Sequence, residues 1–192
     1  MTKRKFAVKV EAKKSFFPLV VYEANITLSL HKDIKTTGMP QEGFAQIYDF
    51  GSVKKNYYMV MDLLGPSLAE LFHFCNYRFS LKTVMMIGHQ MVNRLQYLHE
   101  QSFIHRDLKP DNILMGLAKN SHIVHLVDMG LVKRVFNPVT NEHIPFSTDK
   151  SLTGTASYAS IHAHCGEELS RRDDLEAIGY VLLYFLKGTL PW

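Results

Sequence analysis

The stretch that most limits how this chain can fold is HRDLKPDN at 105–112, in which six of eight side chains are polar or charged. Apolar pairs precede it at 103–104 and follow it at 113–114, so both ends of this loop are expected to be anchored in a core. A loop between a helix and a strand is often rich in Pro and Asp, and this is its ordinary interpretation. That interpretation leaves unexplained a further acid, Asp128, which ends the next predicted strand, HIVHLV at 122–127. The two segments together predict a polar site.

Upstream of this loop, the apolar pattern predicts a small sheet that carries one helix. Residues 5–11, KFAVKVE, alternate with the period of two of a half-buried strand, whose apolar face is Phe6, Val8 and Val10. Residues 18–30 follow with apolar positions near helical spacing, at Leu19, Tyr22, Ile26 and Leu30. The runs FAQIYDF and YYMVMDL flank the turn-like GSVKKN, which predicts a hairpin.

From LLGPSLAELF onward, helices are predicted to predominate, and the boundary is placed at Leu64, giving parts 1–64 and 65–192. Ser67 and Glu70 have the spacing of a capping box. Ser80 is expected to cap a second helix that runs to about His99. The core stripe of this second helix is predicted to be Leu81, Val84, Met85, Met91, Val92, Leu95 and Leu98.

The last third is predicted to be a long surface loop followed by a buried helix. Between Gly130 and Thr155 there is no clear periodicity. The segment DDLEAIGYVLLYFLK, 173–187, is apolar nearly all round, so it is expected to be buried and to stop at Gly188.

Composition and charge indicate a globular protein and favour neither nucleic-acid binding nor a membrane span. The chain has 192 residues, of which 46% are hydrophobic and 21% charged, as in globular proteins with one core or two small lobes. A net charge of +4 suits acidic peptides or phosphates but is too diffuse to indicate nucleic acid. Two cysteines and a start without a signal peptide predict a reducing compartment, cytoplasmic or nuclear. The most apolar run, 175–186, is too short to cross a membrane.

The polar residues of the loop fit the transfer of a phosphoryl group from ATP to a hydroxyl. Such a transfer needs a carboxylate to orient the hydroxyl and accept its proton, a role that Asp107 can fill. It needs oxygen ligands for Mg²⁺, for which Asn112 and Asp128 are suited. It also needs a cation near the transferred phosphate, and Lys109 stands two residues beyond Asp107. In this order and spacing, the loop resembles the protein-kinase signature H-R-D-x-x-x-x-N.

The same resemblance gives a role to a lysine in the first strand. A lone strand lysine more often lies in solvent, and that is the alternative for Lys9. In the kinase fold, however, a strand lysine pairs with a glutamate of the following helix and holds the α- and β-phosphates. FAVKVE resembles that strand, which makes Glu23 the expected partner of Lys9.

The chain as a whole resembles the casein kinase 1 family of serine/threonine protein kinases. The stretches that carry the resemblance are MDLLGPSLAELF, FSLKTV, FIHRDLKPDN, HIPF, LTGTASYASI and SRRDDLEAIGYVLLYFLKGTLPW. It implies an α+β, two-lobed protein-kinase fold, with a small β-rich N-lobe carrying one helix and a mainly helical C-lobe. We expect this fold to be truncated at both ends, because no glycine-rich loop precedes Phe6 and the chain stops at Trp192, before the later helices. One kinase domain would span both parts.

The resemblance also assigns residues to ATP binding. It makes Met61 the gatekeeper and Asp62 to Leu64 the hinge that meets adenine. It makes Ala7 and Leu114 the ceiling and floor of the adenine pocket, although either residue also suits a core. Asp174 would cap the last helix and brace the catalytic loop.

Casein kinases of this type favour acidic or phosphorylated protein substrates. The resemblance therefore assigns an anion site to Arg106, Lys133 and Lys150, each of which taken alone is more often a solvated charge. Ser157 stands where the family usually has arginine, Met129 replaces the phenylalanine of D-F-G, and His162 replaces the asparagine of an S-I-N type motif. The loss of a guanidinium at Ser157 removes a possible two-point phosphate contact.

The implied activity is that of a monomeric serine/threonine protein kinase with ATP and Mg²⁺ as cofactors, no nucleic-acid partner and no membrane partner. One alternative is a pseudokinase-like binding module without turnover, which the missing strands favour and the intact phosphoryl-transfer residues oppose. Another is a metal-binding protein, suggested by ten histidines and the cluster IHAHC at 161–165. There His162 and His164 could share one face of a strand, but the Cys-x-x-Cys spacing common in zinc sites does not occur.

Overall fold

The computed structural model describes residues 4–13, 17–32, 42–140 and 142–192. The chain divides into two compact units. The first comprises Met1–Gly65 and Leu114–Gly130, and the second comprises Pro66–Ile113 and Leu131–Trp192. The segment 114–130 therefore joins the first unit, although it lies far from the rest of that unit in the sequence.

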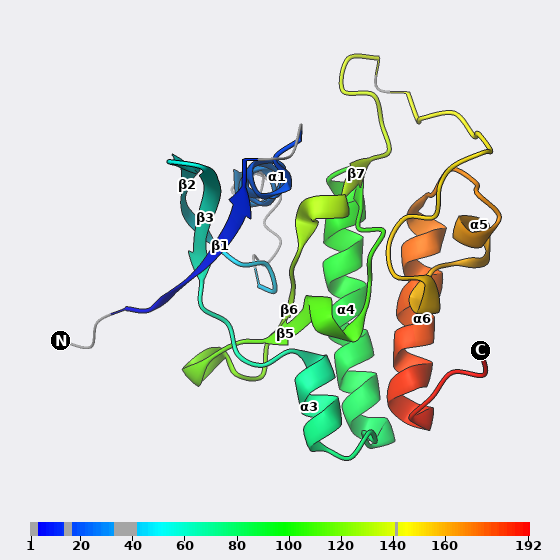
Figure 1. Ribbon diagram of the computed structural model, residues 1–192. Helices are drawn as coiled ribbons and strands as arrows, with labels where there is room; N and C mark the ends of the chain where they lie inside the picture. Colours follow the sequence, from blue (N-terminus) through cyan, green and yellow to red (C-terminus); the bar gives the residue numbers. More distant parts are fainter. Residues whose placement is uncertain (1–3, 14–16, 33–41, 141) are drawn as a thin grey trace. The chain divides into compact units, whose positions relative to one another are not determined.

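The first unit is built on a three-stranded antiparallel sheet of order β1-β3-β2, with one helix packed on it (Figure 1). Its elements are β1 (Phe6–Ala12), α1 (Leu19–Lys32), β2 (Ile47–Val53) and β3 (Asn56–Asp62). The predicted hairpin is confirmed, with a two-residue turn at Lys54 and Lys55, where Lys54 has φ of 52°. The unit also holds the short strand β6 (Val124–Leu126), which pairs with β5 (Ile113–Met115).

The apolar side chains of β1 lie on its exposed face, and the face that carries Lys9 is the partly buried one. Phe6, Val8 and Val10 are 42%, 58% and 58% exposed, whereas Lys9 and its neighbours on the other face are partly buried. The helix α1 packs on the sheet and presents Glu23 to Lys9, so the face of β1 that carries Lys9 is the one covered by the helix.

The helix α1 is confirmed, and its buried stripe matches the predicted one only in part. Leu30 is buried as predicted, whereas Leu19 and Tyr22 are exposed. The residues that pack on the sheet are Val20 and Ala24, which form a core cluster with Ile47 and Met59. The difference is confined to the first part of the helix, where Val20 and Ala24, and not Leu19 and Tyr22, face the sheet.

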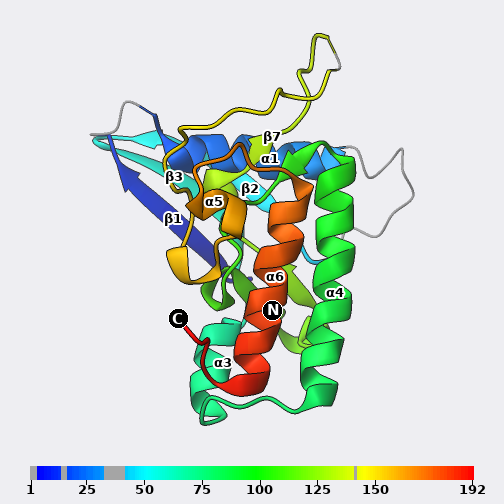
Figure 2. The same cartoon turned by 90° about the vertical axis from the view of Figure 1, so that its right-hand side faces the viewer.

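The second unit is mainly helical, and its two long helices, α4 (Leu81–Glu100) and α6 (Arg171–Lys187), lie side by side in Figures 1 and 2. The shorter helices are α3 (Leu68–Phe74) and α5 (Ile161–His164). The capping box of Ser67 and Glu70 and the cap by Ser80 are present as predicted. Gly188 ends α6 with φ of 84°, a left-handed conformation that favours glycine.

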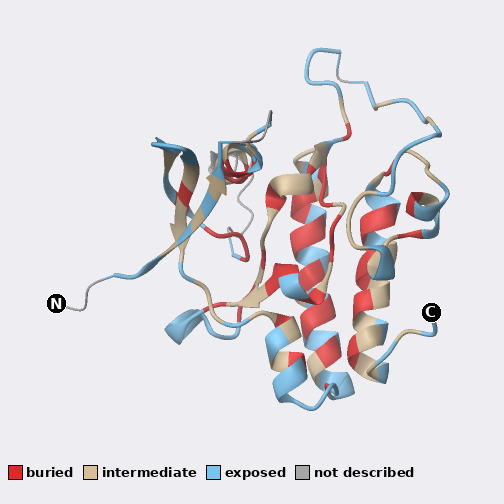
Figure 3. Ribbon diagram, in the orientation of Figure 1, coloured by how far each residue is buried: buried red, intermediate tan, exposed pale blue. Residues whose placement is uncertain are grey.

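Figure 3 shows that the buried residues of α4 and α6 follow one side of each helix. Leu81, Met85 and Val92 were predicted to be core residues and are exposed instead. The buried stripe of α4 includes Val84, Ile87, Met91, Leu95 and Leu98. The helix α6 is likewise amphipathic rather than buried all round, since Leu175 and Leu183 are about half exposed.

The connection after the first unit carries more structure than the predicted surface loop. The strand β7 (Lys133–Arg134) pairs with β4 (Phe103–Ile104), and Val132 and Val135 beside it are buried. Four 3₁₀ turns complete the described elements: η1 (Pro110–Asn112), η2 (Ala118–Asn120), η3 (Met129–Leu131) and η4 (Ala156–Tyr158). No helix within the described ranges is long and apolar enough to cross a membrane.

Candidate active site

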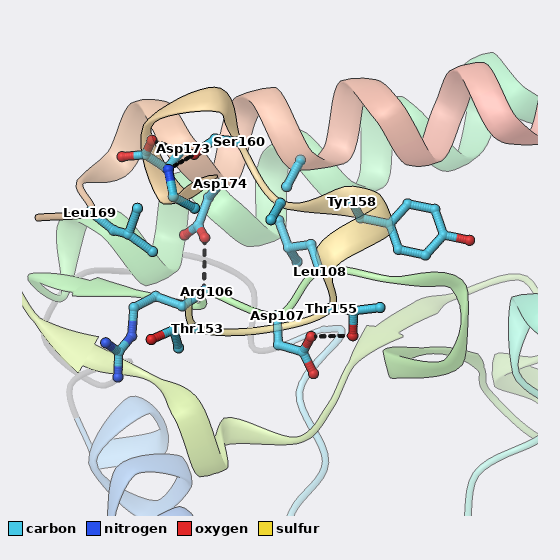
Figure 4. A pocket seen from close by; sticks show the side chains of 13 residues that line it. Arg106, Asp107, Leu108, Thr153, Thr155, Tyr158, Ser160, Leu169, Asp173 and Asp174 are labelled. Atoms are coloured by element: carbon cyan, nitrogen blue, oxygen red, sulfur yellow. Dashed lines mark hydrogen bonds between the residues drawn. The ribbon is translucent and has the colours of Figure 1, made fainter. Parts of the chain in front are cut away.

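The loop 105–112 of the second unit places Asp107 in a network of polar contacts. Its carboxylate accepts hydrogen bonds from Thr155 Oγ1 at 2.7 Å and Asn112 Nδ2 at 3.2 Å, and it pairs with Lys109 Nζ at 2.8 Å. Lys109 also donates to the Thr155 hydroxyl at 3.1 Å. The structure thus brings together the three loop residues predicted from the sequence and adds Thr155, shown beside Asp107 in Figure 4. The sequence prediction missed Thr155 because 48 residues separate it from Asp107.

The surroundings of Asp107 keep its carboxyl group ionised. Burial acts to raise the pKa of Asp107, but the hydrogen bonds from Lys109 and Thr155 and the charge of Lys109 outweigh burial and hold this pKa below its usual value. A carboxylate that is ionised and only 8% exposed can orient a hydroxyl group and accept its proton.

Asp174 of α6 holds the backbone of this loop. Its carboxylate accepts hydrogen bonds from the backbone N–H of His105 at 2.8 Å and of Arg106 at 2.9 Å, and contacts His99 Nε2 at 2.8 Å. Arg106 has φ of 71°, which is rare for a residue with a side chain. The buried carboxylate of Asp174 therefore stabilises a loop conformation that would otherwise be unfavourable. Figure 4 draws its hydrogen bond with Arg106.

The cap of α6 differs from the prediction. Ser170 is the N-cap, and its partner in the capping box is Asp173, not Asp174. Asp173 also accepts a hydrogen bond from the buried Ser160 hydroxyl at 2.7 Å. The two adjacent aspartates therefore have different partners. Asp174 accepts hydrogen bonds from the backbone of the loop 105–112, and Asp173 accepts one from Ser160, in the segment that follows Thr155.

Gly154 is required for the close approach of these two segments. It has φ of 88°, and a Cβ atom at this position would lie 2.2 Å from the backbone oxygen of Arg106. No side chain fits there, so Gly154 allows Thr155 to reach Asp107.

In the first unit, Lys9 is held by two carboxylates. Its Nζ lies 2.6 Å from Glu23 Oε2 and 2.9 Å from Asp128 Oδ1. The predicted Lys9–Glu23 pair is present, and the interpretation of Lys9 as a solvated strand lysine is wrong. Asp128 follows β6 with φ of 64°, which turns the chain so that its carboxylate faces Lys9.

The pKa values of Lys9 and Glu23 are both raised, for different reasons. Burial acts to lower the pKa of Lys9, but the charge and hydrogen bond of Glu23, with those of Asp128, outweigh it. Burial is the main cause of the raised pKa of Glu23, and Lys9 only partly offsets it. The ammonium group is therefore firmly charged, as a group that binds phosphate should be.

The residues assigned to adenine also lie in the first unit. Ala7 of β1 stands opposite Met61 of β3 in the sheet register. Leu114 lies in β5, and the neighbouring Met115 accepts a hydrogen bond from Gly65 N at 2.8 Å. The strand pairing thus places Ala7 beside the gatekeeper position, while their contact with adenine, like that of Leu64, stays a prediction.

The side chain of Asp62 has a structural partner within the sheet. It accepts hydrogen bonds from Tyr48 Oη at 2.6 Å and from the backbone N–H of Gln46 at 3.0 Å. Its own backbone N–H donates to the Gln46 oxygen at 3.0 Å. Asp62 therefore fastens the end of β3 to β2, where the hinge is predicted to begin.

The three basic residues assigned to anion binding lie together in the second unit. Arg106, Lys133 and Lys150 line one cavity of about 200 Å³. The acids Glu167 and Glu168 line the same cavity, which the sequence prediction had not included. The cavity is therefore cationic but contains carboxylates of its own.

The histidine cluster does not form a metal site. His162 and His164 lie on the short helix α5 and not on a strand. His162 Nδ1 contacts Glu167 at 2.7 Å, and His164 Nε2 contacts the backbone oxygen of Ala156 at 3.0 Å. Among the residues that the structure describes, no group of three or more His, Cys, Asp or Glu side chains could hold a metal ion.

Magnesium would be held with fewer protein ligands than such a group provides. Asn112 donates through Nδ2 to the backbone oxygen of Asp107 at 2.9 Å, which leaves its Oδ1 as the atom suited to a cation. Asp128 supplies a carboxylate in the first unit. Oxygen ligands of this kind, with waters and substrate phosphates, are what Mg²⁺ usually takes from a protein, so the chemistry of each of the two side chains suits this ion.

A basic strand residue paired with a helix glutamate, an ionised loop aspartate with its lysine, and two oxygen donors define a protein of the phosphoryl-transfer class. The chain belongs to the protein kinase family: a family model described as the protein kinase domain matches residues 2–192. This match confirms the predicted protein-kinase fold, and the small sheet with its helix and the mainly helical unit are its parts. Protein kinases act on protein substrates and generally use ATP and Mg²⁺.

Proposed function

We propose that this chain is a serine/threonine protein kinase of the casein kinase 1 type, which transfers the γ-phosphoryl group of ATP to acidic or phosphoprimed proteins. The observation that carries the proposal is the Asp107 carboxylate, which is ionised, nearly buried, and held by Lys109 and Thr155. A carboxylate held in this way is charged and fixed in position, so it is available to orient a substrate hydroxyl.

In the proposed reaction, each residue has one task. Asp107 orients the substrate hydroxyl and accepts its proton, while Lys109 offsets negative charge beside it. Lys9, kept charged and in place by Glu23, binds phosphate oxygens. Asn112 and Asp128 would hold Mg²⁺, which supplies charge neutralisation on the phosphates when bound.

The preference for acidic or phosphorylated substrates is supported by the grouping of Arg106, Lys133 and Lys150 on one cavity. Arg106 lies within the loop 105–112, directly before Asp107, so an anion bound there would belong to a residue near the phosphate acceptor in the substrate. Arginine and lysine side chains are the usual ligands of phosphate groups in proteins.

The test is transfer of labelled γ-phosphate from Mg-ATP to casein by the purified chain. Asp107→Asn, which keeps the size of the side chain, is the control for contaminating kinases. Transfer that disappears in this control supports the proposal. A folded chain that transfers nothing supports the alternative, a binding module without turnover.

We also propose that the protein is monomeric and works inside the cell, in the cytoplasm or nucleus. Cys75 and Cys165 are both exposed free thiols, which suits a reducing compartment. Sedimentation of the purified chain and imaging of the tagged protein test the two statements.

A further inference from the structure

Glu168 occupies the cationic cavity of the second unit. Its Oε1 lies 2.5 Å from Lys133 Nζ, and its Oε2 lies 3.4 Å from Lys150 Nζ. The side chain of Glu168 is only 11% exposed. The carboxylate therefore bridges two of the three cations that line the cavity, and an incoming anion meets lysines that already have a partner.

We propose that Glu168 restricts this cavity to phosphorylated substrates: every anion must displace it from Lys133 and Lys150, and after that cost a side-chain carboxylate binds too weakly to help, whereas a phosphate group still binds. The inference rests on the proposed function and deepens it, since it decides between the two substrate classes named there. Glu168 is thus a specificity-determining residue.

The physical reason is the small change in free energy when one carboxylate replaces another at the two lysines. A substrate Asp or Glu that displaced Glu168 would replace one carboxylate by another, with the same charge and the same number of oxygens. It would also have to compete with a group attached to the site, whose effective concentration is high. A substrate carboxylate therefore gains little binding free energy by entering the cavity.

A phosphate group changes that balance. It carries a charge of about −1.5 to −2 and three strong acceptor oxygens. It can therefore contact both lysines and a third cation, Arg106, which lines the same cavity. The cavity measures about 200 Å³, which leaves room for a phosphate group once Glu168 is displaced.

The backbone around Glu168 keeps its carboxylate at the cavity. Glu168 N donates to Ser147 O at 2.8 Å, and Lys150 N donates to Gly166 O at 2.9 Å. Burial acts to raise the pKa of Glu168, but Lys133 and Lys150 outweigh it and hold this pKa below its usual value. Glu168 is therefore ionised near neutral pH, and its carboxylate competes with an incoming anion for Lys133 and Lys150.

The neighbouring acid gives a matched control. Glu167 lines the same cavity but pairs with His162 at 2.7 Å and Arg172 at 3.4 Å. Glu167→Gln and Glu168→Gln make the same change in charge, one position apart. Only the second removes the carboxylate that bridges the two lysines.

The first experiment compares three peptides that differ at one position upstream of the acceptor serine, which is alanine, glutamate or phosphoserine. We expect wild-type kcat/KM to be at least tenfold higher for the phosphoserine peptide than for the glutamate peptide. In Glu168→Gln we expect the glutamate and phosphoserine peptides both to improve about tenfold against the alanine peptide, so that a glutamate peptide used little better than alanine by wild type is clearly preferred to it by the variant. Glu167→Gln should keep the wild-type values. A glutamate peptide that stays no better than alanine in a folded Glu168→Gln variant, or an equal gain in both variants, overturns the proposal.

The second experiment measures binding of inorganic phosphate without any turnover, by titration calorimetry at constant ionic strength. Glu168→Gln should bind phosphate about tenfold more tightly than wild type, and Lys133→Met should bind it more weakly. Equal affinities in wild type and Glu168→Gln overturn the proposal. If no peptide is phosphorylated by any variant, the proposed function fails, but this titration still decides the role of Glu168. If Glu168→Gln does not fold, Glu168→Asp replaces it, with a smaller gain in the same direction.

Discussion

Replacing Asp174 by alanine should destabilise the second unit more than any exposed acidic substitution. The carboxylate receives three contacts, from His105 N, Arg106 N and His99 Nε2, at 2.8 to 2.9 Å, and it is 2% exposed. A hydrogen bond to a charged group contributes about 1.5–3 kcal/mol, and bonds that share one acceptor do not add fully. We expect a total loss of about 3–5 kcal/mol, the cost of breaking a buried charged network.

The backbone of Arg106 adds to this loss. A residue with a side chain in the left-handed region is strained by about 1–3 kcal/mol, and Asp174 accepts the N–H of Arg106 itself. Without the carboxylate the loop is expected to relax away from this conformation and move Asp107. The kcat of Asp174→Ala should therefore fall even at temperatures where the variant is folded.

The assay is thermal unfolding followed by far-ultraviolet circular dichroism and by the fluorescence of Trp192. This residue is the sole tryptophan and packs on Tyr180 of α6, with ring centroids 5.1 Å apart, so it reports the second unit. At about 2–4 °C per kcal/mol, Tm should fall by about 10 °C. The control is Asp111→Ala, an exposed acid of the same loop region, which should change stability by less than about 0.5 kcal/mol. A Tm of Asp174→Ala within about 2 °C of wild type would refute the reasoning.

Three further predictions concern the reacting groups. Lys9→Met leaves Glu23 buried without its cation and removes a phosphate ligand, so kcat/KM should fall on the order of 10²-fold; near wild-type turnover would show that Lys9 does not bind phosphate. Thr155→Val removes the hydroxyl between Asp107 and Lys109, and steady-state kinetics should show kcat about tenfold lower with KM for ATP unchanged, restored by Thr155→Ser; failure of serine to restore it would argue for a packing role. The pKa of Asp107 is lower in the folded chain than in the unfolded chain, so the unfolded chain binds more protons between that pKa and about 3.9. The free energy of unfolding should therefore rise with pH across this window, and it should rise less in Asp107→Asn than in wild type. Urea titrations that give the same pH dependence of the free energy of unfolding for both proteins would contradict the ionised state of Asp107.

Local features of this protein could be predicted from its sequence, because their causes are local. Ser67 and Ser80 cap their helices as expected, since a cap depends on residues within one turn. The loop of Asp107 was recognisable because its chemistry is concentrated in eight residues. The pairing of Lys9 with Glu23 was predicted only through the resemblance to kinases, since neither residue stands out alone.

The buried faces of the elements could not be predicted equally well. Phe6 and Val8 are exposed on β1, and Met85 is exposed on α4, although each belongs to an apolar pattern. A periodic pattern indicates that one face is apolar, but packing partners distant in the sequence decide which face is covered. On β1, the charged side chain of Lys9 lies on the inner face, where it pairs with Glu23 of α1.

The sequence by itself determined the strand-and-helix order, the helix caps and the family of this protein, because these depend on short-range spacing and on motifs. Only the tertiary structure decided the partners of the reactive side chains. Thr155 reaches Asp107 across 48 residues, Glu168 reaches Lys133 across 35, and Asp128 reaches Lys9 across 119. Such contacts form because packing of the whole unit offsets the entropy of closing long loops, and no local pattern records that balance.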